Sequence, residues 1–213
     1  MVRIDSAAGS LPALRRELPM AGQRRERSDA AANRERILGA ARTLLAEQGP
    51  DALTMQAVAT AAGVGKGTVF HRFGDRDGLT QALIDDYMRD FQDAFLHGPP
   101  PLGPGAPPAE RLDAFVVELV QIQADHLELA LAAENPARHP LLPAYATLAI
   151  HIAALVHEIN PTLDQVVVAG FILNAIAPPV LHRMRSVLGV DTPTLQTNAR
   201  ALLQGLTRTG DDP

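Results

Sequence analysis

The sequence predicts an all-α protein made of two helical parts. Apolar residues recur at helical spacing along most of the 213 residues, and this period of about 3.6 is the main sequence sign of amphipathic helices. Two short helical patterns flank a turn at Ala62-Gly63-Val64. Residues 98–108 hold six prolines and three glycines, a composition that no helix tolerates. This segment predicts a linker between an N-terminal and a C-terminal domain.

The composition agrees with this fold class and excludes several kinds of site. Hydrophobic residues make up 46% of the chain and aromatic residues 4%, so we expect a core of mostly Leu, Ala, Val and Ile. The absence of cysteine excludes disulfides and thiolate chemistry. No apolar run approaches the roughly 20 residues that are needed to cross a bilayer. The N-terminal part has several arginines but lacks the apolar segment that follows them in a secretion signal. We therefore expect no membrane association and a cytoplasmic protein.

The beginning of the chain differs in pattern from the helix that follows it. Residues 1–30 have little periodicity and many Arg, Ala, Gly and Pro, which predicts a flexible Arg-rich arm. Such an arm could add phosphate or minor-groove contacts, and an inert tail is an equally open alternative. A first domain helix is predicted over about 33–48 because its apolar stripe ends at Gly49-Pro50. That stripe consists of Ile37, Leu38, Ala41, Leu44 and Leu45.

Residues 53–73 have the layout of a helix-turn-helix, in which the second helix enters the major groove of DNA and the first braces it. Thr54 precedes an apolar series and is expected to cap the first helix, and Gly63 stands where the turn needs a positive φ. The side expected to face inward carries Val64, Val69 and Phe73. The side left outward carries Lys66, Thr68, His71 and Arg72. A basic, polar face beside a buried apolar one suits docking onto DNA.

The distribution of charge fits a chain that meets DNA at one end. The formal net charge is −5, yet residues 1–73 hold 11 Lys or Arg against 7 Asp or Glu, whereas the remainder holds 8 against 17. A basic N-terminal part with an acidic remainder is expected when only one end meets phosphate.

Further helices are predicted after the helix-turn-helix. Leu79, Leu83, Tyr87, Phe91 and Phe95 repeat every four residues and predict a helix that runs toward the second domain. The later helical patterns begin at Ala109 and cover about 112–121, 126–133, 143–159, 162–177 and 194–206. The pattern over 162–177 is expected to break at Pro178-Pro179 before the helix resumes toward 188. The predicted organisation is an arm (1–30), a helix-turn-helix domain (31–97), a linker (98–108), a C-terminal helical domain (109–207) and a tail (208–213).

The segment 33–95 resembles the DNA-binding domain of TetR-family transcriptional regulators. The recognition stretch of that family usually reads Gly-Val-Ser-Lys-Gly-Thr-Leu-Tyr, followed by an aromatic or His pair and a Phe, and this chain has GVGKGTVFHRF over 63–73 without a gap. Gly65 replaces the usual Ser, so the recognition helix loses a side-chain cap worth roughly a few tenths of a kcal/mol. Phe70 replaces the usual Tyr, whose hydroxyl often reaches a phosphate. The second half of the chain resembles the family only in length and helical pattern.

The resemblance implies how DNA contacts are divided. Lys66 would donate to guanine O6 and N7, Gln56 and His71 would meet base edges, and Phe70 would touch a thymine methyl. Residues expected to hold phosphates and set the register are Thr54, Thr68, Arg72 and Arg76. Gly67 completes the predicted DNA-binding set.

The resemblance also implies a fold in which the C-terminal helical bundle serves ligand binding and dimerisation. A homodimer would occupy a palindromic operator on double-stranded DNA, with two recognition helices spaced roughly 34–36 Å apart. A small, mostly apolar molecule entering the C-terminal domain would release it, as in a repressor. The expected dimer contacts are Val167, Gly170, Leu195, Ala199, Leu202 and Leu206.

The candidate ligand contacts are polar residues among the apolar faces of the C-terminal helices, together with one aromatic residue. They are Gln121, His126, Tyr145, His151, Phe171 and Asn174. An ordinary surface or core role is the alternative for each of them. The low aromatic content argues against a flat stacking cage.

Catalytic and metal sites find little support in the sequence. The stretch 63–68 superficially resembles a phosphate loop, but that pattern needs Gly in place of Thr60, Ser or Thr in place of Gly67, and a preceding strand. His151 and His157 are six apart and point to different sides of a helix, unlike the i, i+4 pair of a zinc site. No serine stands in a nucleophile elbow. We therefore expect no enzyme, no metal and no cofactor.

The alternative to a DNA-binding regulator is a helical protein-interaction module that keeps this shape without using it on DNA. Gly65, Phe70 and the acidic remainder of the chain favour it. Strong salt dependence of DNA binding would argue against it.

Overall fold

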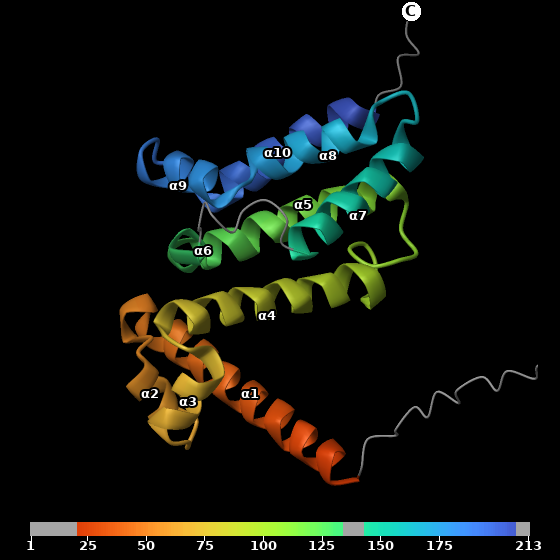
Figure 1. The fold of residues 1–213 in the computed structure, drawn as a ribbon. Helices are drawn as coiled ribbons and strands as arrows, with labels where there is room; N and C mark the ends of the chain where they lie inside the picture. The colour runs from red at the N-terminus through yellow and green to blue at the C-terminus, as the bar shows by residue number, and fades with distance from the viewer. Residues whose placement is uncertain (1–20, 134–142, 208–213) are drawn as a thin grey trace, which may run out of the picture.

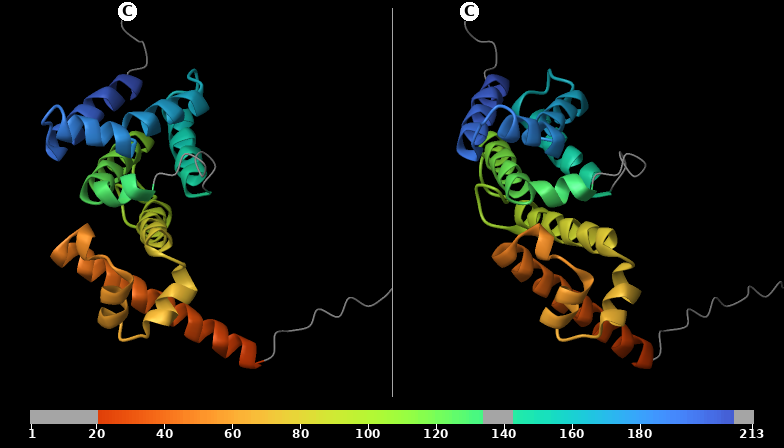
Figure 2. Two further views of the ribbon diagram at one scale, coloured as in Figure 1. Left: turned by 60° about the vertical axis from the view of Figure 1, so that its left-hand side comes forward. Right: turned by 90° about the vertical axis from the view of Figure 1, so that its left-hand side faces the viewer.

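The structure, a computed structural model, describes residues 21–133 and 143–207, and every regular element within them is a helix. The elements are α1 (Ala21–Gln48), the 3-10 turn η1 (Pro50–Ala52), α2 (Met55–Ala61), α3 (Lys66–Phe73), α4 (Arg76–His97), α5 (Pro108–Asp125), α6 (Leu127–Ala133), α7 (Pro143–Ile159), α8 (Gln165–Ala175), α9 (Pro178–Ser186) and α10 (Thr192–Thr207). The predicted all-α class is confirmed. Figures 1 and 2 show α1 to α3 at one end of the molecule, α5 to α10 at the other, and α4 between them.

The first helix begins earlier than the sequence pattern predicted. α1 starts at Ala21, so the predicted arm is wrong for residues 21–30. This stretch has no apolar stripe, but it is rich in Ala, Arg, Gln and Glu, which favour a helix without any packing partner. Figure 1 shows this end of α1 projecting away from the other helices. Residues 1–20 of the predicted arm, and the tail from 208 to 213, lie outside the described residues.

The N-terminal core joins the first four helices. α1 contributes Ile37, Leu38 and Ala41, as its predicted stripe requires. The other members from this part of the chain are Leu53, Met55, Val58, Ala59, Ala62, Val69, Phe73, Leu79, Ala82 and Leu83. One further buried member comes from much later in the sequence: Leu129 of α6 is only 5% exposed and packs in the same core.

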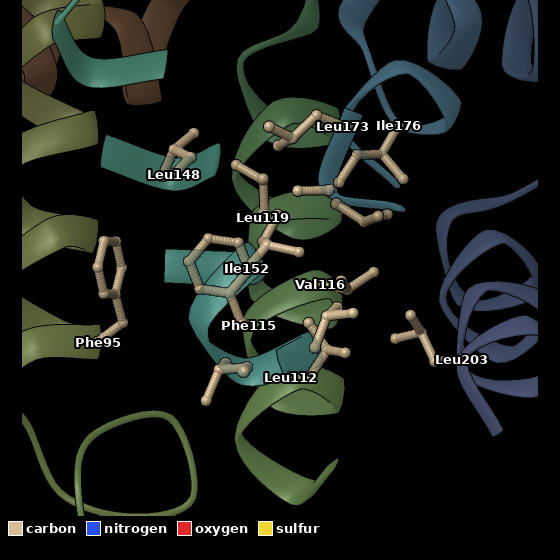
Figure 3. Close-up of a cluster of buried hydrophobic side chains, with 14 of the residues drawn as sticks. Phe95, Leu112, Phe115, Val116, Leu119, Leu148, Ile152, Leu173, Ile176 and Leu203 are labelled. Atoms are coloured by element: carbon tan, nitrogen blue, oxygen red, sulfur yellow. The ribbon is translucent and has the colours of Figure 1, made fainter. Parts of the chain in front are cut away.

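The C-terminal core is centred on α5, which packs against both α7 and α10. Figure 3 shows Phe115 of α5 between Phe95 of α4 and the side chains of the later helices. The other buried members include Phe91, Leu112, Val116, Leu119, Leu148, Ile152, Leu173, Ile176 and Leu203.

The two cores meet within α4 and not at the proline-rich segment. Leu79 and Leu83 lie in the N-terminal core, whereas Phe91 and Phe95 lie in the C-terminal core. The apolar repeat of α4 was predicted correctly, but one continuous helix serves both domains. Residues 98–108 connect α4 to α5, and they follow two turns of α4 that already belong to the second core.

The chain breaks between α8 and α9 at the prolines where the sequence predicted a break. Asp164 caps α8 by accepting from the backbone N–H groups of Val166 and Val167 at 3.0 and 3.1 Å. α9 starts with Pro178, where the ring removes no needed donor. No single helix in the described residues is long and apolar enough to cross a membrane, although α8 and α9 taken together satisfy length and composition across their bend.

We expect Leu129→Ala to lower the free energy of unfolding by about 2–4 kcal/mol, because it leaves a cavity in the N-terminal core. The truncated side chain belongs to α6, which lies outside that domain in the sequence. Urea unfolding followed by circular dichroism measures the loss. Leu131→Ala, which truncates a half-buried leucine on the same helix, is the matched control and should cost less. Equal losses for the two variants would contradict the role of Leu129 in the N-terminal core.

Candidate nucleic-acid interface

The turn between α2 and α3 has the local geometry that the sequence predicted. Thr54 caps α2, since its hydroxyl oxygen accepts from the backbone N–H of Ala57 at 3.1 Å. Gly63 has a φ of 63°, a left-handed conformation that is cheap only for glycine. The backbone N–H of Val64 then donates to the carbonyl of Ala59 at 3.0 Å, which closes the end of α2.

α3 is held by its inner face. Val69 and Phe73 are buried in the N-terminal core, and Val64 packs against it from the turn. The guanidinium of Arg34 lies 5.3 Å from the centre of the Phe73 ring, so α1 also covers this end of α3. These contacts fix the rotation of α3 about its axis and decide which side chains face outward.

The outer face of α3 carries the predicted DNA contacts. Lys66, Thr68 and His71 are exposed, whereas Arg72 is half-buried. The Lys66 ammonium lies 5.5 Å from the centre of the Phe70 ring, and Phe70 itself is 42% exposed. A Cβ on Gly67 would meet no atom within 4 Å, so the packing of this chain alone does not require glycine there.

Three further predicted DNA contacts already have partners within the chain. The guanidinium of Arg76 donates to the carbonyl oxygen of Pro50 at 2.9 Å and ties the start of α4 to η1. Gln56 is exposed and its amide lies 3.5 Å from the Thr60 hydroxyl. The Thr54 hydroxyl caps α2, as described above. Thr54 and Gln56 therefore lie together at the start of α2, Thr54 as its cap and Gln56 in its first turn.

The start of α3 lacks the side-chain cap that a serine would provide. Gly65 occupies the cap position in an extended conformation, with φ −66° and ψ 143°, and makes no side-chain hydrogen bond. A Cβ placed there would lie 3.7 Å from the Thr68 hydroxyl oxygen, an ordinary contact. The backbone at this position therefore suits serine.

The six candidate ligand residues do not form one site. Gln121 lies between α5 and α10, where it bonds Asp125 at 2.8 Å and Gln196 at 3.1 Å. Phe171 is 71% exposed on α8, and Asn174 on the same helix donates to the carbonyl of Gly170 at 2.8 Å. None of these three residues is among the members of the C-terminal core or the residues packed against it.

Tyr145 and His151 of α7 are the candidates that border the C-terminal core. Tyr145 packs against its buried residues. The His151 ring lies 4.3 Å from the Phe95 ring and 5.2 Å from the Phe115 ring, centre to centre. Burial and the charge of Arg111 lower the pKa of His151 to about 4, so this imidazole is neutral at neutral pH.

His126 lies at the junction of the two cores, where sequence reasoning expected a ligand contact. It follows α5 and stacks on Tyr87 of α4, with ring centres 3.9 Å apart and an angle of 18°. The Arg42 guanidinium of α1 also lies over the Tyr87 ring, 4.6 Å from its centre. Arg42 also pairs with Asp86 at 2.6 Å and with Asp90 at 2.7 Å. Burial lowers the pKa of His126.

This stack was missed by sequence reasoning. Tyr87 stood out only as one member of an apolar repeat, and no spacing rule relates it to His126 or to Arg42. Beside the stack, a cleft of about 620 Å³ is lined by both domains. Its walls include Leu45, Pro50, His126, His182, Arg185 and Asp191.

The predicted dimer residues separate into two groups. Val167 and Leu202 are exposed, and Leu202 has 75% of its surface accessible. Leu195 and Ala199 instead pack half-buried against the C-terminal core of their own chain, because that side of α10 covers α5. A Cβ on Gly170 would meet nothing within 4 Å. The side chain of Leu206 lies outside the described residues.

Within the described residues, no group of three or more His, Asp or Glu side chains is arranged to hold a metal ion.

Comparison with known proteins finds a family match within the first domain. Residues 37–83 match the family described as bacterial regulatory proteins, tetR family. The HTH-type transcriptional regulator AlkX of Mycobacterium tuberculosis is 34% identical over 80 residues, which cover 30% of this chain and only 38% of that protein's length.

Solved structures resemble most of the chain in fold. A putative TetR-family transcriptional regulator from Rhodococcus sp. has a TM-score of 0.60 at 22% identity and covers 84% of this chain and 100% of its own. A TetR-family transcriptional regulator from Pectobacterium atrosepticum has a TM-score of 0.63 at 16% identity and covers 85% of this chain and 95% of its own. The likeness in fold therefore extends into the C-terminal domain, beyond the residues that the family model matches.

We expect Gly65→Ser to raise the free energy of unfolding by a few tenths of a kcal/mol, roughly, because its hydroxyl can accept from the N–H of Thr68 at the start of α3. Gly65→Ala is the matched control, since it adds the Cβ without the acceptor, and it should be less stable than the serine variant by about 1 kcal/mol. Thermal unfolding of the three proteins gives the order. Equal stability of the Ser and Ala variants would show that this cap contributes nothing.

Proposed function

We propose that the protein is a transcriptional regulator of the TetR family that binds an operator through α3, and the match of residues 37–83 to the tetR family supports this proposal. The observation that carries the proposal is the division of α3 into two faces. Val69 and Phe73 anchor one face in the N-terminal core, and the other face presents Lys66, Thr68 and His71 to solvent. A helix held in this way can enter the major groove while its support stays outside.

The exposed groups suit both base and phosphate contacts. Lys66 is the only lysine of the sequence, and its ammonium is a donor for guanine O6 and N7. Gln56 and His71 are proposed to meet base edges, and Phe70 a thymine methyl. Phosphate contacts are assigned to Thr54, Thr68, Arg72 and Arg76. The open space at Gly67 supports a close approach of the DNA backbone.

We infer that the operator is palindromic and that two copies of the chain bind it. The support is a set of exposed apolar side chains on α8, the helix that buries Ala169 and Leu173 in the C-terminal core. Its members Val166, Val167 and Phe171 are 70%, 49% and 71% exposed, and Gly170 lies among them. Contiguous apolar surface of this kind marks an interaction site. We name Val166, Val167, Gly170 and Phe171 the α8 face, and Leu202 of α10 is a further exposed apolar residue of this domain.

Control by a small molecule would act through the junction of the two cores. The His126–Tyr87–Arg42 stack and Leu129 connect α5 and α6 to α4 and α1. A ligand that displaces α6 would therefore disturb the support of α2 and α3. Reversing a DNA-binding equilibrium from 1:99 to 99:1 needs a preference of about 5.5 kcal/mol for one state. Because the ligand would release the protein from its operator, the protein acts as a repressor in this proposal.

A protein-interaction module remains the second candidate function. The exposed α8 face and the missing cap at Gly65 favour it. Selection from random duplex DNA separates the two functions, because only the DNA-binding regulator enriches a sequence. Affinity that falls steeply with salt would support phosphate contacts, and the absence of enrichment at low salt would favour the interaction module.

On the selected operator, Lys66→Ala should weaken binding by about 1–3 kcal/mol and should lower affinity for random DNA much less. Arg89→Ala is the matched control, because it removes a cation from α4 that already pairs with Asp86 at 2.7 Å. Fluorescence anisotropy on both DNAs measures the ratio. Operator DNA should also protect the Lys66 amine from chemical acetylation, which would show directly that bound DNA covers this residue. Equal losses on operator and random DNA would overturn the base-reading role of Lys66.

Phe171→Glu and Leu202→Glu should each shift the protein toward the monomer, since a carboxylate in an apolar interface loses hydration without gaining a partner. Sedimentation velocity at several concentrations measures the shift. Leu188→Glu is the matched control, as Leu188 is 62% exposed but lies at the turn after α9. A wild-type protein that sediments as a monomer at high concentration would contradict the dimer.

A further inference from the structure

His126 is the residue at which α5 ends and α6 begins. Its backbone N–H donates to the carbonyl of Ile122 at 3.2 Å, and its own carbonyl accepts from the backbone N–H of Ala130 at 2.8 Å. Figure 1 shows α6 between α4 and α9, and both helices contact it. A displacement of His126 therefore moves the start of α6, the helix that places Leu129 in the N-terminal core.

The His126 side chain packs on an aromatic ring that also faces a cation. Its imidazole is half-buried and stacks on Tyr87 with ring centres 3.9 Å apart, and the Arg42 guanidinium lies 4.6 Å from the centre of the same ring. A neutral imidazole is compatible with this neighbour. An imidazolium would bring a second positive charge to the same ring, in a half-buried place where water and salt screen the repulsion less than at the surface.

The carboxylates on the α4 side of the stack are already paired. Asp86 and Asp90 bond the Arg42 guanidinium at 2.6 and 2.7 Å. Asp86 also pairs with Arg89 at 2.7 Å. A protonated His126 in the stacked position would therefore have to compete with arginines for these two aspartates.

A second environment for the same side chain lies beside the stack. His126 lines the cleft of about 620 Å³ between the two domains. The only guanidinium among the lining residues, that of Arg185, donates to the carbonyl of Ala124 at 2.7 Å. The other titratable residues of the lining are exposed, and they are Asp125, Glu128, Asp191 and His182. This cleft therefore offers a cation both water and three carboxylates.

The stack favours the uncharged imidazole. Burial lowers the pKa of His126 below its usual value of 6.5, and the charge of Asp125 opposes this shift whereas that of Arg42 adds to it. A histidine whose pKa is lowered by folding stabilises the fold fully above the pKa of the unfolded chain, and this stabilisation is lost as the pH falls below it. The window for His126 therefore opens near pH 6.5 and extends into the acid range.

We propose that the junction of the two domains is an acid-sensitive switch, in which protonated His126 leaves Tyr87 for the acidic cleft and draws α6 away from α4. Leu129 then leaves the N-terminal core, and the support of α2 and α3 is weakened. The inference does not depend on the proposed function, because the switch lies between the domains and its test needs no DNA.

Hydrogen exchange measured by mass spectrometry tests the switch in the full chain at pH 7.5 and pH 5.5. After correction for the intrinsic pH dependence of exchange, the protection of the α6 amides should fall by about two- to tenfold at the lower pH. One pH unit below its ordinary pKa, a released histidine gains at most about tenfold from protonation.

Two variants separate the charge of His126 from its packing. His126→Phe keeps an aromatic ring on Tyr87 but cannot take up a proton, so the protection of its α6 should be the same at both pH values. His182→Phe is the matched control, because it removes an exposed imidazole from the opposite wall of the same cleft. It should lose protection at pH 5.5 as the parent does.

Nuclear magnetic resonance of the parent protein follows the imidazole directly. His126 should titrate at a lower pH than the exposed His182, and its signals should shift together with those of Leu129. A His126 that titrates no lower than His182, equal protection of α6 at both pH values, or a loss that persists in His126→Phe would each overturn the switch. The titration of the parent needs no variant, so it decides the question even if His126→Phe does not fold.

Discussion

The sharing of α4 between two hydrophobic cores is the constraint on which the rest of the structure depends. Its 22 residues extend about 33 Å, with Leu79 and Leu83 in one core and Phe91 and Phe95 in the other. A straight helix anchored at both ends cannot tilt in one domain without moving in the other. The stack of His126 on Tyr87 stands between the two anchors and adds a second route from α5 to the same helix.

Several local features near α3 could be predicted from the sequence because neighbours in the chain supply them. The cap by Thr54, the positive φ of Gly63 and the inward Val69 and Phe73 each depend on residues within one or two turns. The same local reasoning failed at residues 21–30, where helix propensity acts without an apolar stripe. The DNA-binding set as a whole stays a prediction, since its partner is a second molecule.

The C-terminal domain was harder to predict because its contacts join distant parts of the chain. His126 pairs with Tyr87, and Leu129 enters a core built by residues 37–83. α8 is apolar on all sides, so periodicity could not tell the exposed Phe171 from the buried Leu173.

The position of Leu129 has a consequence for biosynthesis. Domains usually fold in the order in which they emerge from the ribosome. Here the core beneath α2 and α3 lacks one buried leucine until α6 has been made, so the nascent N-terminal domain remains incompletely packed while α4 and α5 are translated. The outer face of α3 therefore gains its complete support only when the second domain has begun to fold, and a chain truncated before α6 retains an unfilled site in its first core.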